Sequence, residues 1–441
     1  MVIPLEIGKS YHKALIANYF GSLLKDPFEF HNSQEGMRFL HKAISDLSKH
    51  QPVEQVVIGM EATGHYFKIP AAMLHDLGYS NLFILNPLST SYCRKAGLTW
   101  SKTDDEDLCA IGQALICGYG NPYQPEKPLW EDLKEACRYR RALIRYQTSL
   151  KNRIHAKLDL LLPGITELTM FSNTHLWSPA SLDFFLKYPD LESIGQLNPK
   201  NIIKSFQSQG RRLSPEMAYQ LIQWSKNALN PHLRATDCRK FIFKSLIEQL
   251  RKLSQDISQI EVKLTGYLVQ IPAVLLLSID YIGPVRAAEF AGEISPFDQY
   301  PESSALIKAA GLDSTRYQSS TLESSKHPIS KKGSRRLRYI TIDIADSLMK
   351  QNQHFAYLSK KLLEKGRSKG CACVATGARF IRTAFWMIKE QKPFQPPDGL
   401  GISEEPLAKI TAFLQTLHAS DLNDEYLSYA QKYFKKGEKT M

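Results

Sequence analysis

The stretch QVVIGMEATGHY, residues 55–66, joins an apolar run rich in β-branched residues to a turn. Such a run has the length and composition of a strand that is buried in a sheet. It ends at Glu61, which can be an ordinary strand-end residue or one with a chemical role. The stretch therefore predicts a central strand that carries a carboxylate at its end.

Short β-rich runs and helical patterns alternate on both sides of this strand. Further strands are predicted at 1–10, 13–20, 26–33 and 81–87. Helices are predicted at 33–50 and 66–78, and another begins near the acidic run from Asp104 to Asp107. The order β-β-β-α-β-α-β-α indicates a mixed sheet flanked by helices.

From about residue 128 the pattern changes to long amphipathic helices rich in Arg and Lys. Two of them, at 131–164 and 237–268, fit either an antiparallel pair or a coiled coil between subunits. The segment 166–230 between them is irregular, and the sequence predicts neither its fold nor its role. We expect four parts, with bounds 1–125, 126–265, 266–395 and 396–441.

The bulk composition is that of a globular chain with a basic surface. The 441 residues, 43% of them hydrophobic, are enough for two or three domains. Lys and Arg number 56 against 44 Asp and Glu, a net charge of +12 that favours nucleic acid as the partner. Seven scattered cysteines indicate reduced thiols. No apolar run is long enough to span a bilayer and the secretory pattern is missing, so we expect a cytoplasmic protein with no membrane partner.

Acidic residues fall where the predicted strands and helices meet. Glu6 lies inside the apolar first strand, and Asp104 and Asp107 are three residues apart, hence on one helical face. The acidic run alone also fits a favourable interaction with the helix dipole. The element order places these residues and Glu61 on one rim of the sheet. Oxygen-only ligands of this kind suit Mg²⁺ or Mn²⁺, and two such ions can promote phosphodiester displacement.

Motifs in the first third of the chain resemble a known family. MEATGHY at 60–66, NP at 86–87 and KTDDED at 102–107 resemble the DEDD transposases of the insertion-sequence one-ten family. That family includes Piv-type invertases and recombinases guided by a bridge RNA. SLKNRIHAKLDLLLPG at 149–164 is similar to the family's helical linker, and AAGLDSTRYQSS and ISKKGSRRLR, within 309–338, are similar to its C-terminal domain.

The resemblance covers about 1–165 and 265–395, and it implies a fold for each part. Residues 1–125 would be a RuvC-like domain with an RNase H fold, and 126–265 a helical linker or coiled-coil region with an insertion. Residues 266–395 would be a mostly helical C-terminal transposase domain, and 396–441 a helical tail.

Carried over to this chain, the resemblance implies a set of catalytic residues. The four DEDD acids would be Glu6, Glu61, Asp104 and Asp107, which would bind Mg²⁺, with Mn²⁺ as the alternative; Glu6 stands where the family normally has Asp. The nucleophile would be Ser319, with Ser320 in the place of the family's Gly and as the alternative nucleophile. The serine and the metal cluster would form one composite site, contributed by different protomers, that makes a covalent phosphoserine link to DNA.

Two clusters of basic residues are candidates for phosphate binding, although a charge run is more often a solvated face. The residues that we expect to bind nucleic acid are Lys102, Arg138, Arg141, Arg145, Lys151, Asn152, Arg153, Lys331, Lys332, Arg335, Arg336 and Arg338.

The sequence as a whole therefore predicts a DNA transposase or recombinase that cuts and rejoins DNA. The resemblance further implies a structured guide RNA and a homo-oligomer, with dimers that pair into a tetramer. Three alternatives stay open: a Mg²⁺-dependent structure-selective nuclease, a Piv-like site-specific invertase, and an inactive nucleic-acid-binding protein.

Overall fold

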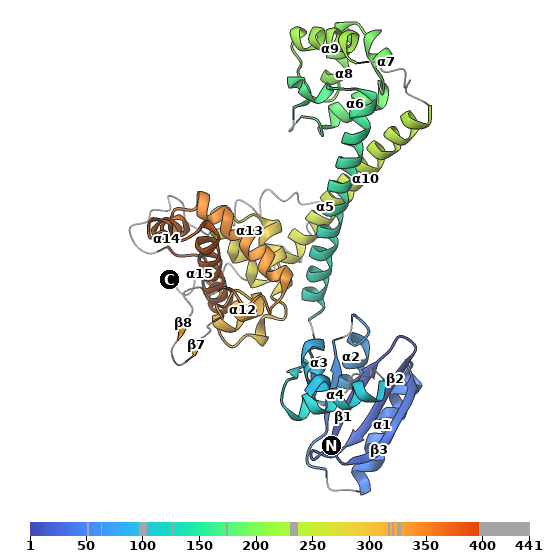
Figure 1. Ribbon diagram of the computed structural model, residues 1–441, viewed down its shortest axis with the longest axis vertical. Coiled ribbons are helices and arrows are strands. Elements are labelled where there is room, and N and C mark those ends of the chain that lie inside the picture. Colours follow the sequence, from blue (N-terminus) through green and yellow to red (C-terminus); the bar gives the residue numbers. More distant parts are fainter. Residues whose placement is uncertain are drawn as a thin grey trace. The chain divides into compact units, whose positions relative to one another are not determined.

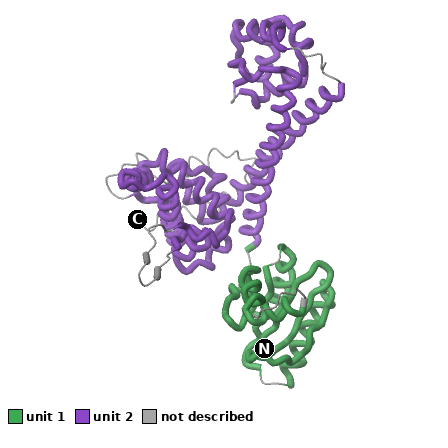
Figure 2. The backbone as a smooth tube through the Cα atoms, in the orientation of Figure 1, with its two compact units in different colours: residues 1–127 green, residues 128–441 purple. Residues whose placement is uncertain are grey.

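The structure, a computed structural model, divides the chain into two compact units, residues 1–127 and 128–441 (Figure 2). The residues that it describes are 1–50, 53–62, 64–96, 104–125, 127–172, 175–229, 237–315, 318–319, 322–323 and 328–396.

Residues 1–127 are built on a six-stranded mixed sheet of order β3-β2-β1-β4-β5-β6 (Figure 1). β4 and β5 run parallel to β1, whereas the β1–β2, β2–β3 and β5–β6 pairs are antiparallel. The strands are β1 (Val2–Ile7), β2 (Tyr11–Ala17), β3 (Leu23–His31), β4 (Val57–Glu61), β5 (Leu82–Leu85) and β6 (Asn121–Pro122). The predicted mixed sheet is confirmed.

The helices of this unit are α1 (Gln34–His50), α2 (Lys68–Asp76), α3 (Pro87–Ala96) and α4 (Asp104–Ile116). The predicted element order is confirmed, with two additions: α3 lies between β5 and the helix of the acidic run, and β6 follows that helix. α1 begins after Ser33, whose hydroxyl oxygen accepts a hydrogen bond of 3.1 Å from the Gly36 amide. Met37 and Leu40 of α1 pack with Leu5 of β1 in one core, so α1 covers that face of the sheet.

The opposite face of the sheet is covered by α4. A β-carbon on Gly59 of β4 would lie 2.3 Å from the Leu115 side chain of α4, which would have to shift to admit it. A β-carbon on Gly112 of α4 would lie 3.6 Å from Pro4 of β1, an ordinary contact. α4 therefore rests directly on the two central strands.

In residues 128–441, α5 (Pro128–Leu161) and α10 (Asp237–Leu268) form a long pair of helices (Figure 1). Arg140 of α5 forms an ion pair with Glu261 of α10, and Gln147 donates a hydrogen bond of 3.2 Å to Ser254. Seven residues forward on α5 thus correspond to seven residues back on α10, so the helices are antiparallel. The structure shows this pair within one chain.

The segment between these two helices is itself a small helical bundle. Its elements are η1 (Ile165–Glu167), η2 (Thr169–Phe171), α6 (Pro179–Lys187), α7 (Leu191–Gly195), α8 (Pro199–Gln207) and α9 (Pro215–Asn227). Phe171, Phe184, Phe185 and Phe206 are fully buried and pack against the facing ends of α5 and α10 in one core.

The remaining described elements are η3 (Pro272–Ser278), α11 (Pro284–Glu293), η4 (Phe297–Gln299), α12 (Ser303–Ala310), β7 (Gln318–Ser319), β8 (Leu322–Glu323), α13 (Arg335–Gln351), α14 (Gln353–Glu364) and α15 (Lys369–Glu390). The helices among them share one apolar core, to which Leu133 of α5 and Leu264 of α10 also contribute. In the described part of the chain no single helix has the length and composition of a membrane span; α10 and η3 pass that test only together, across a bend of 107°.

Candidate functional site

Glu6 and Glu61 lie side by side at the carboxyl ends of two neighbouring parallel strands. Leu5 of β1 is opposite Met60 of β4, and Glu6 and Glu61 are the next residues along. Their Cα atoms are therefore about 4.8 Å apart and their side chains leave the same face of the sheet. Both residues are partly buried. This is the adjacency expected of two carboxylates that share a cation.

The N-terminal end of α4 lies over the same rim of the sheet. Lys13, which is opposite Glu6 in the β1–β2 register, forms an ion pair of 3.0 Å with Asp105 in the first turn of α4. Asp107 follows half a turn later, and only 14% of its side chain is exposed. Asp104 begins α4, but its side chain lies outside the described part of the structure.

α3 presents two side chains, one turn apart, to these carboxylates. The buried Thr90 hydroxyl donates a hydrogen bond of 2.8 Å to Oε2 of Glu61 and also lies 3.0 Å from the Pro87 carbonyl oxygen. Arg94 forms an ion pair with Asp107. The predictions from sequence did not include Thr90 or Arg94, although their four-residue spacing after the NP motif is a usable signal.

The donor atoms at this rim are of one chemical kind. Glu6, Glu61 and Asp107 offer only carboxylate oxygens, the ligands that Mg²⁺ and Mn²⁺ prefer. Among the described side chains, no three from His, Cys, Asp and Glu are grouped closely enough to hold one ion. Glu6, Glu61 and Asp107 lie near one rim of the sheet without forming such a group, and the side chain of Asp104 lies outside the described part of the structure, so the four-carboxylate site stays a prediction.

Ser319 is the last residue of β7, and its backbone is opposite Leu322 in the two-stranded β7–β8 sheet. Its side chain, like Ser320, lies outside the described part of the structure. The base of this hairpin is well held. The Thr315 amide donates to the Pro328 carbonyl oxygen at 2.9 Å, and the Ser330 hydroxyl donates to Oδ1 of Asp313 at 2.5 Å.

The loop after the hairpin leads directly into α13, and the predicted basic cluster spans this loop and the start of α13. A β-carbon on Gly333 would lie 2.1 Å from the Ala309 carbonyl oxygen, so the loop packs tightly on α12. Arg338 donates a hydrogen bond of 3.1 Å to the Ala310 carbonyl oxygen and helps to hold this loop. The exposed residues of the cluster are Lys331, Lys332, Arg335 and Arg336.

The residues of α5 that are predicted to bind nucleic acid fall into two groups. Arg138 and Arg141 form ion pairs with Glu293 and Glu289 of α11. The others are exposed or partly exposed, namely Arg145, Lys151, Asn152 and Arg153. Lys102 lies outside the described residues.

Two protein-family models match this chain. Residues 5–163 match the family model of the DEDD transposases of IS110 type, described as a transposase. Residues 273–359 match that of the transposases of the IS116/IS110/IS902 family. A search of curated proteins gave no match. The first match spans the carboxylate rim, and the second spans the Ser319 hairpin and the whole of α13.

Proposed function

The chain belongs to the IS110 family of transposases, and on this basis we propose that it cuts and rejoins DNA with a carboxylate-bound metal ion and a serine nucleophile. Its transposase domains indicate a DNA substrate, and its DEDD domain indicates use of a divalent metal ion. The observation that carries the proposal is the adjacent placement of Glu6 and Glu61 at the ends of β1 and β4. We take the mixed sheet as a RuvC-like RNase H fold, and we keep the domain bounds 1–125, 126–265, 266–395 and 396–441.

The proposed metal ligands are Glu6, Glu61, Asp104 and Asp107, and the proposed ion is Mg²⁺. When bound, the ion offsets the negative charge that develops on the reacting phosphate. The protein contributes orientation: the Thr90 hydroxyl fixes one oxygen of Glu61, and the sheet register sets Glu6 beside it. Glu6 supplies a carboxylate one methylene longer than the Asp found in the family.

The proposed nucleophile is the Ser319 hydroxyl, with Ser320 as the alternative. Its oxygen attacks a DNA phosphorus, the phosphorus bond to one ester oxygen breaks, and the proton lost by the serine is balanced by the proton taken up by the departing strand's hydroxyl. Attack by a hydroxyl of another strand then reverses the step and releases the serine. The short hairpin suits this role because its base, from Asp313 to Thr315 and from Pro328 to Ser330, is held by hydrogen bonds.

The partners we propose are donor and target DNA, a structured guide RNA, and further copies of this chain. The exposed basic residues of α5 and of the loop before α13 would bind nucleic-acid phosphates. The composite site would join the carboxylates of one protomer to the serine of another, in dimers that pair into a tetramer.

Analysis of the reaction products tests this proposal against the nuclease and invertase alternatives. The chain is incubated with supercoiled DNA that carries the element and its flanking sequence, together with RNA transcribed from that flank, with and without Mg²⁺. We expect strands rejoined in a new order, lost in Asp107→Asn and when the metal is removed. Free ends without rejoining would favour the nuclease, and inversion of a segment between fixed sites, without RNA, would favour the invertase.

A further inference from the structure

A cleft in residues 128–441 is lined by charged side chains from α5, α11 and α13. The charged residues that line it are Arg138, Arg141, Arg145, Glu289, Glu293 and Arg336. Four guanidinium groups thus face two carboxylates, so the cleft carries a surplus of two positive charges. A surplus of this kind in a concave site attracts an anion.

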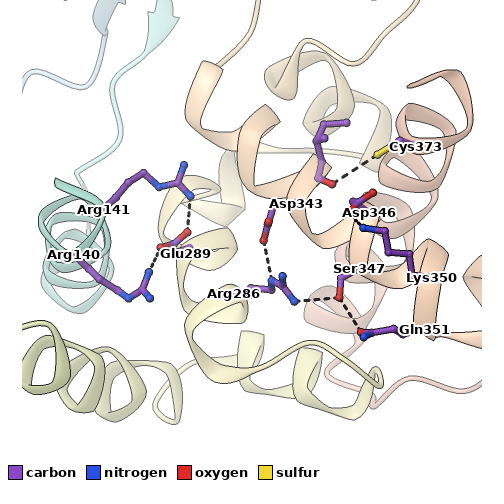
Figure 3. A network of polar contacts seen from close by, with 11 residues as sticks. Arg140, Arg141, Arg286, Glu289, Asp343, Asp346, Ser347, Lys350, Gln351 and Cys373 are labelled. Atoms are coloured by element: carbon purple, nitrogen blue, oxygen red, sulfur yellow. Dashed lines mark hydrogen bonds and ion pairs between the residues drawn. The ribbon is translucent and has the colours of Figure 1, made fainter. Parts of the chain in front are cut away.

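Two of the four arginines are held by the two carboxylates. Arg138 binds Glu293 through two parallel hydrogen bonds of 3.0 and 3.1 Å. Nη2 of Arg141 lies 2.6 Å from Glu289, and its guanidinium lies 4.2 Å from the centre of the Tyr339 ring. Figure 3 shows Glu289 between Arg140 and Arg141, which approach it from α5. Both carboxylates of the cleft are therefore already paired with arginines.

The other two arginines, Arg145 of α5 and Arg336 of α13, carry the surplus charge. Both are exposed, and within the described ranges neither takes part in an ion pair or hydrogen bond. They approach the cleft from different helices. An anion between them would therefore bridge α5 and α13.

The cleft is held in shape by α11, which is tied to both of its neighbours. Toward α5 it offers Glu289, which is 7% exposed, and toward α13 it offers Arg286. Nε of Arg286 donates to Asp343 at 2.8 Å, and its Nη1 donates to the Ser347 hydroxyl at 3.2 Å (Figure 3). The α11 wall of the cleft is thus fixed before an anion enters, whereas the exposed side chains of Arg145 and Arg336 become ordered when it binds.

The position of Arg336 connects the cleft with the serine hairpin. Arg336 lies in the first turn of α13, and the loop before that turn pairs back onto the residues that precede the hairpin. The C-terminal end of the segment that carries Ser319 is thus close in sequence to Arg336, and its N-terminal end is held to that end by hydrogen bonds.

We propose that this cleft binds a backbone phosphate of DNA between Arg145 and Arg336, while Arg138 and Arg141 serve as structural clamps. The inference rests on the proposed function, because it takes DNA as the substrate. The sequence predicts nucleic-acid binding for all four arginines of this cleft. The proposal assigns phosphate contact in the cleft to Arg145 and Arg336 alone.

The salt dependence of duplex binding tests this assignment in the full-length chain. The logarithm of the association constant falls with the logarithm of salt concentration, by a slope of about 0.9 for each phosphate contact. We expect Arg145→Gln/Arg336→Gln to lower the magnitude of that slope by about 0.9. Arg367→Gln/Arg382→Gln is the matched control, because it removes two exposed arginines outside the cleft and should leave the slope unchanged. Thermal unfolding of each variant establishes that it is folded.

Each outcome decides the inference. If the double variant is folded and its slope equals that of the wild type, the cleft does not bind DNA. A slope that falls for structured RNA alone would assign the cleft to RNA instead. Stabilisation by inorganic phosphate that the double variant loses, with an unchanged DNA slope, would mark a small-anion site and overturn the inference. A wild-type chain that binds no DNA would overturn the proposed function as well.

Discussion

The Thr90 hydroxyl of α3 donates a hydrogen bond of 2.8 Å to Oε2 of Glu61 at the end of β4. Because Thr90 is buried, this bond fixes the carboxylate in one orientation relative to Glu6 on the neighbouring strand. The ion pair of Arg94 with Asp107 adds a second contact from the same face of α3. α3 therefore acts as a support for the carboxylate rim.

Thr90→Val should weaken metal binding without unfolding the chain. Loss of a hydrogen bond to a charged group costs about 1.5 kcal/mol, which is roughly a tenfold change in an equilibrium constant. We expect the Mg²⁺ concentration for half-maximal strand rejoining to rise by about that factor. Thr90→Ser, which keeps the hydroxyl, should behave as the wild type. Equal Mg²⁺ requirements in Thr90→Val and wild type would show that the bond has no positioning role.

Arg94→Gln should make the chain more dependent on the metal ion for its stability. The substitution leaves the Asp107 carboxylate without its cation, so the metal-free chain loses stability and gains more when Mg²⁺ binds. We expect the Mg²⁺-induced rise in unfolding temperature to exceed that of the wild type. Arg38→Gln, at an exposed site on α1, should change neither the stability of the metal-free chain nor the Mg²⁺-induced rise in unfolding temperature. A smaller rise in Arg94→Gln would mean that Arg94 supports metal binding.

Acidification below neutral pH should destabilise both units. Burial lowers the pKa of His12 below its ordinary value of 6.5, and burial together with Arg379 lowers the pKa of His354. As the pH falls through 6.5, the unfolded chain binds protons at these sites while the folded chain does not, so the free energy of unfolding decreases. Urea unfolding at pH 7.5 and 5.5 measures the effect. His12→Leu should reduce the loss; an identical loss in this variant would exclude His12 as a contributor.

Glu289→Gln should destabilise the joint between α5 and α11 strongly. Glu289 is 7% exposed and pairs with Arg140 and Arg141, so its loss leaves the partly buried Arg141 without its carboxylate and Arg140 with Glu261 alone. We expect a loss of about 3 kcal/mol in the free energy of unfolding. Asp346→Asn removes a carboxylate from an exposed pair with Lys350 and should cost less than about 1 kcal/mol. Equal losses in urea unfolding would contradict the structural role of Glu289.

Local patterns allowed much of the first unit to be predicted. The strand that ends at Glu61 and the helix capped by Ser33 lie where the apolar periodicity and the capping residue indicate. The segment 166–230 stayed unassigned, although Ser178, Asn198 and Ser214 each precede a proline at the start of a helix. These capping residues indicate from the sequence where three helices begin. The packing of the helices into a bundle is not indicated, because it depends on aromatic contacts between segments far apart along the chain.

The roles of the arginines could not be predicted, because their partners are remote in sequence. Arg138 and Glu293 are 155 residues apart, and Arg141 and Glu289 are 148 apart. A cluster of positive charge along one helix indicates phosphate binding equally well whether or not a carboxylate from another helix lies against it. Only the fold distinguishes the clamped arginines from the exposed ones.

The identity of the residue that becomes attached to DNA tests the central claim most directly. Reaction of the chain with DNA and Mg²⁺ is quenched with denaturant, the DNA is digested with nuclease, and the adduct is located by peptide mass spectrometry. We expect the phosphodiester remnant on Ser319, and no adduct in Ser319→Ala. Covalent attachment that persists in Ser319→Ala would contradict the assignment; an adduct on Ser320 would transfer the role to its neighbour, and the absence of any adduct in the active wild type would exclude the serine mechanism.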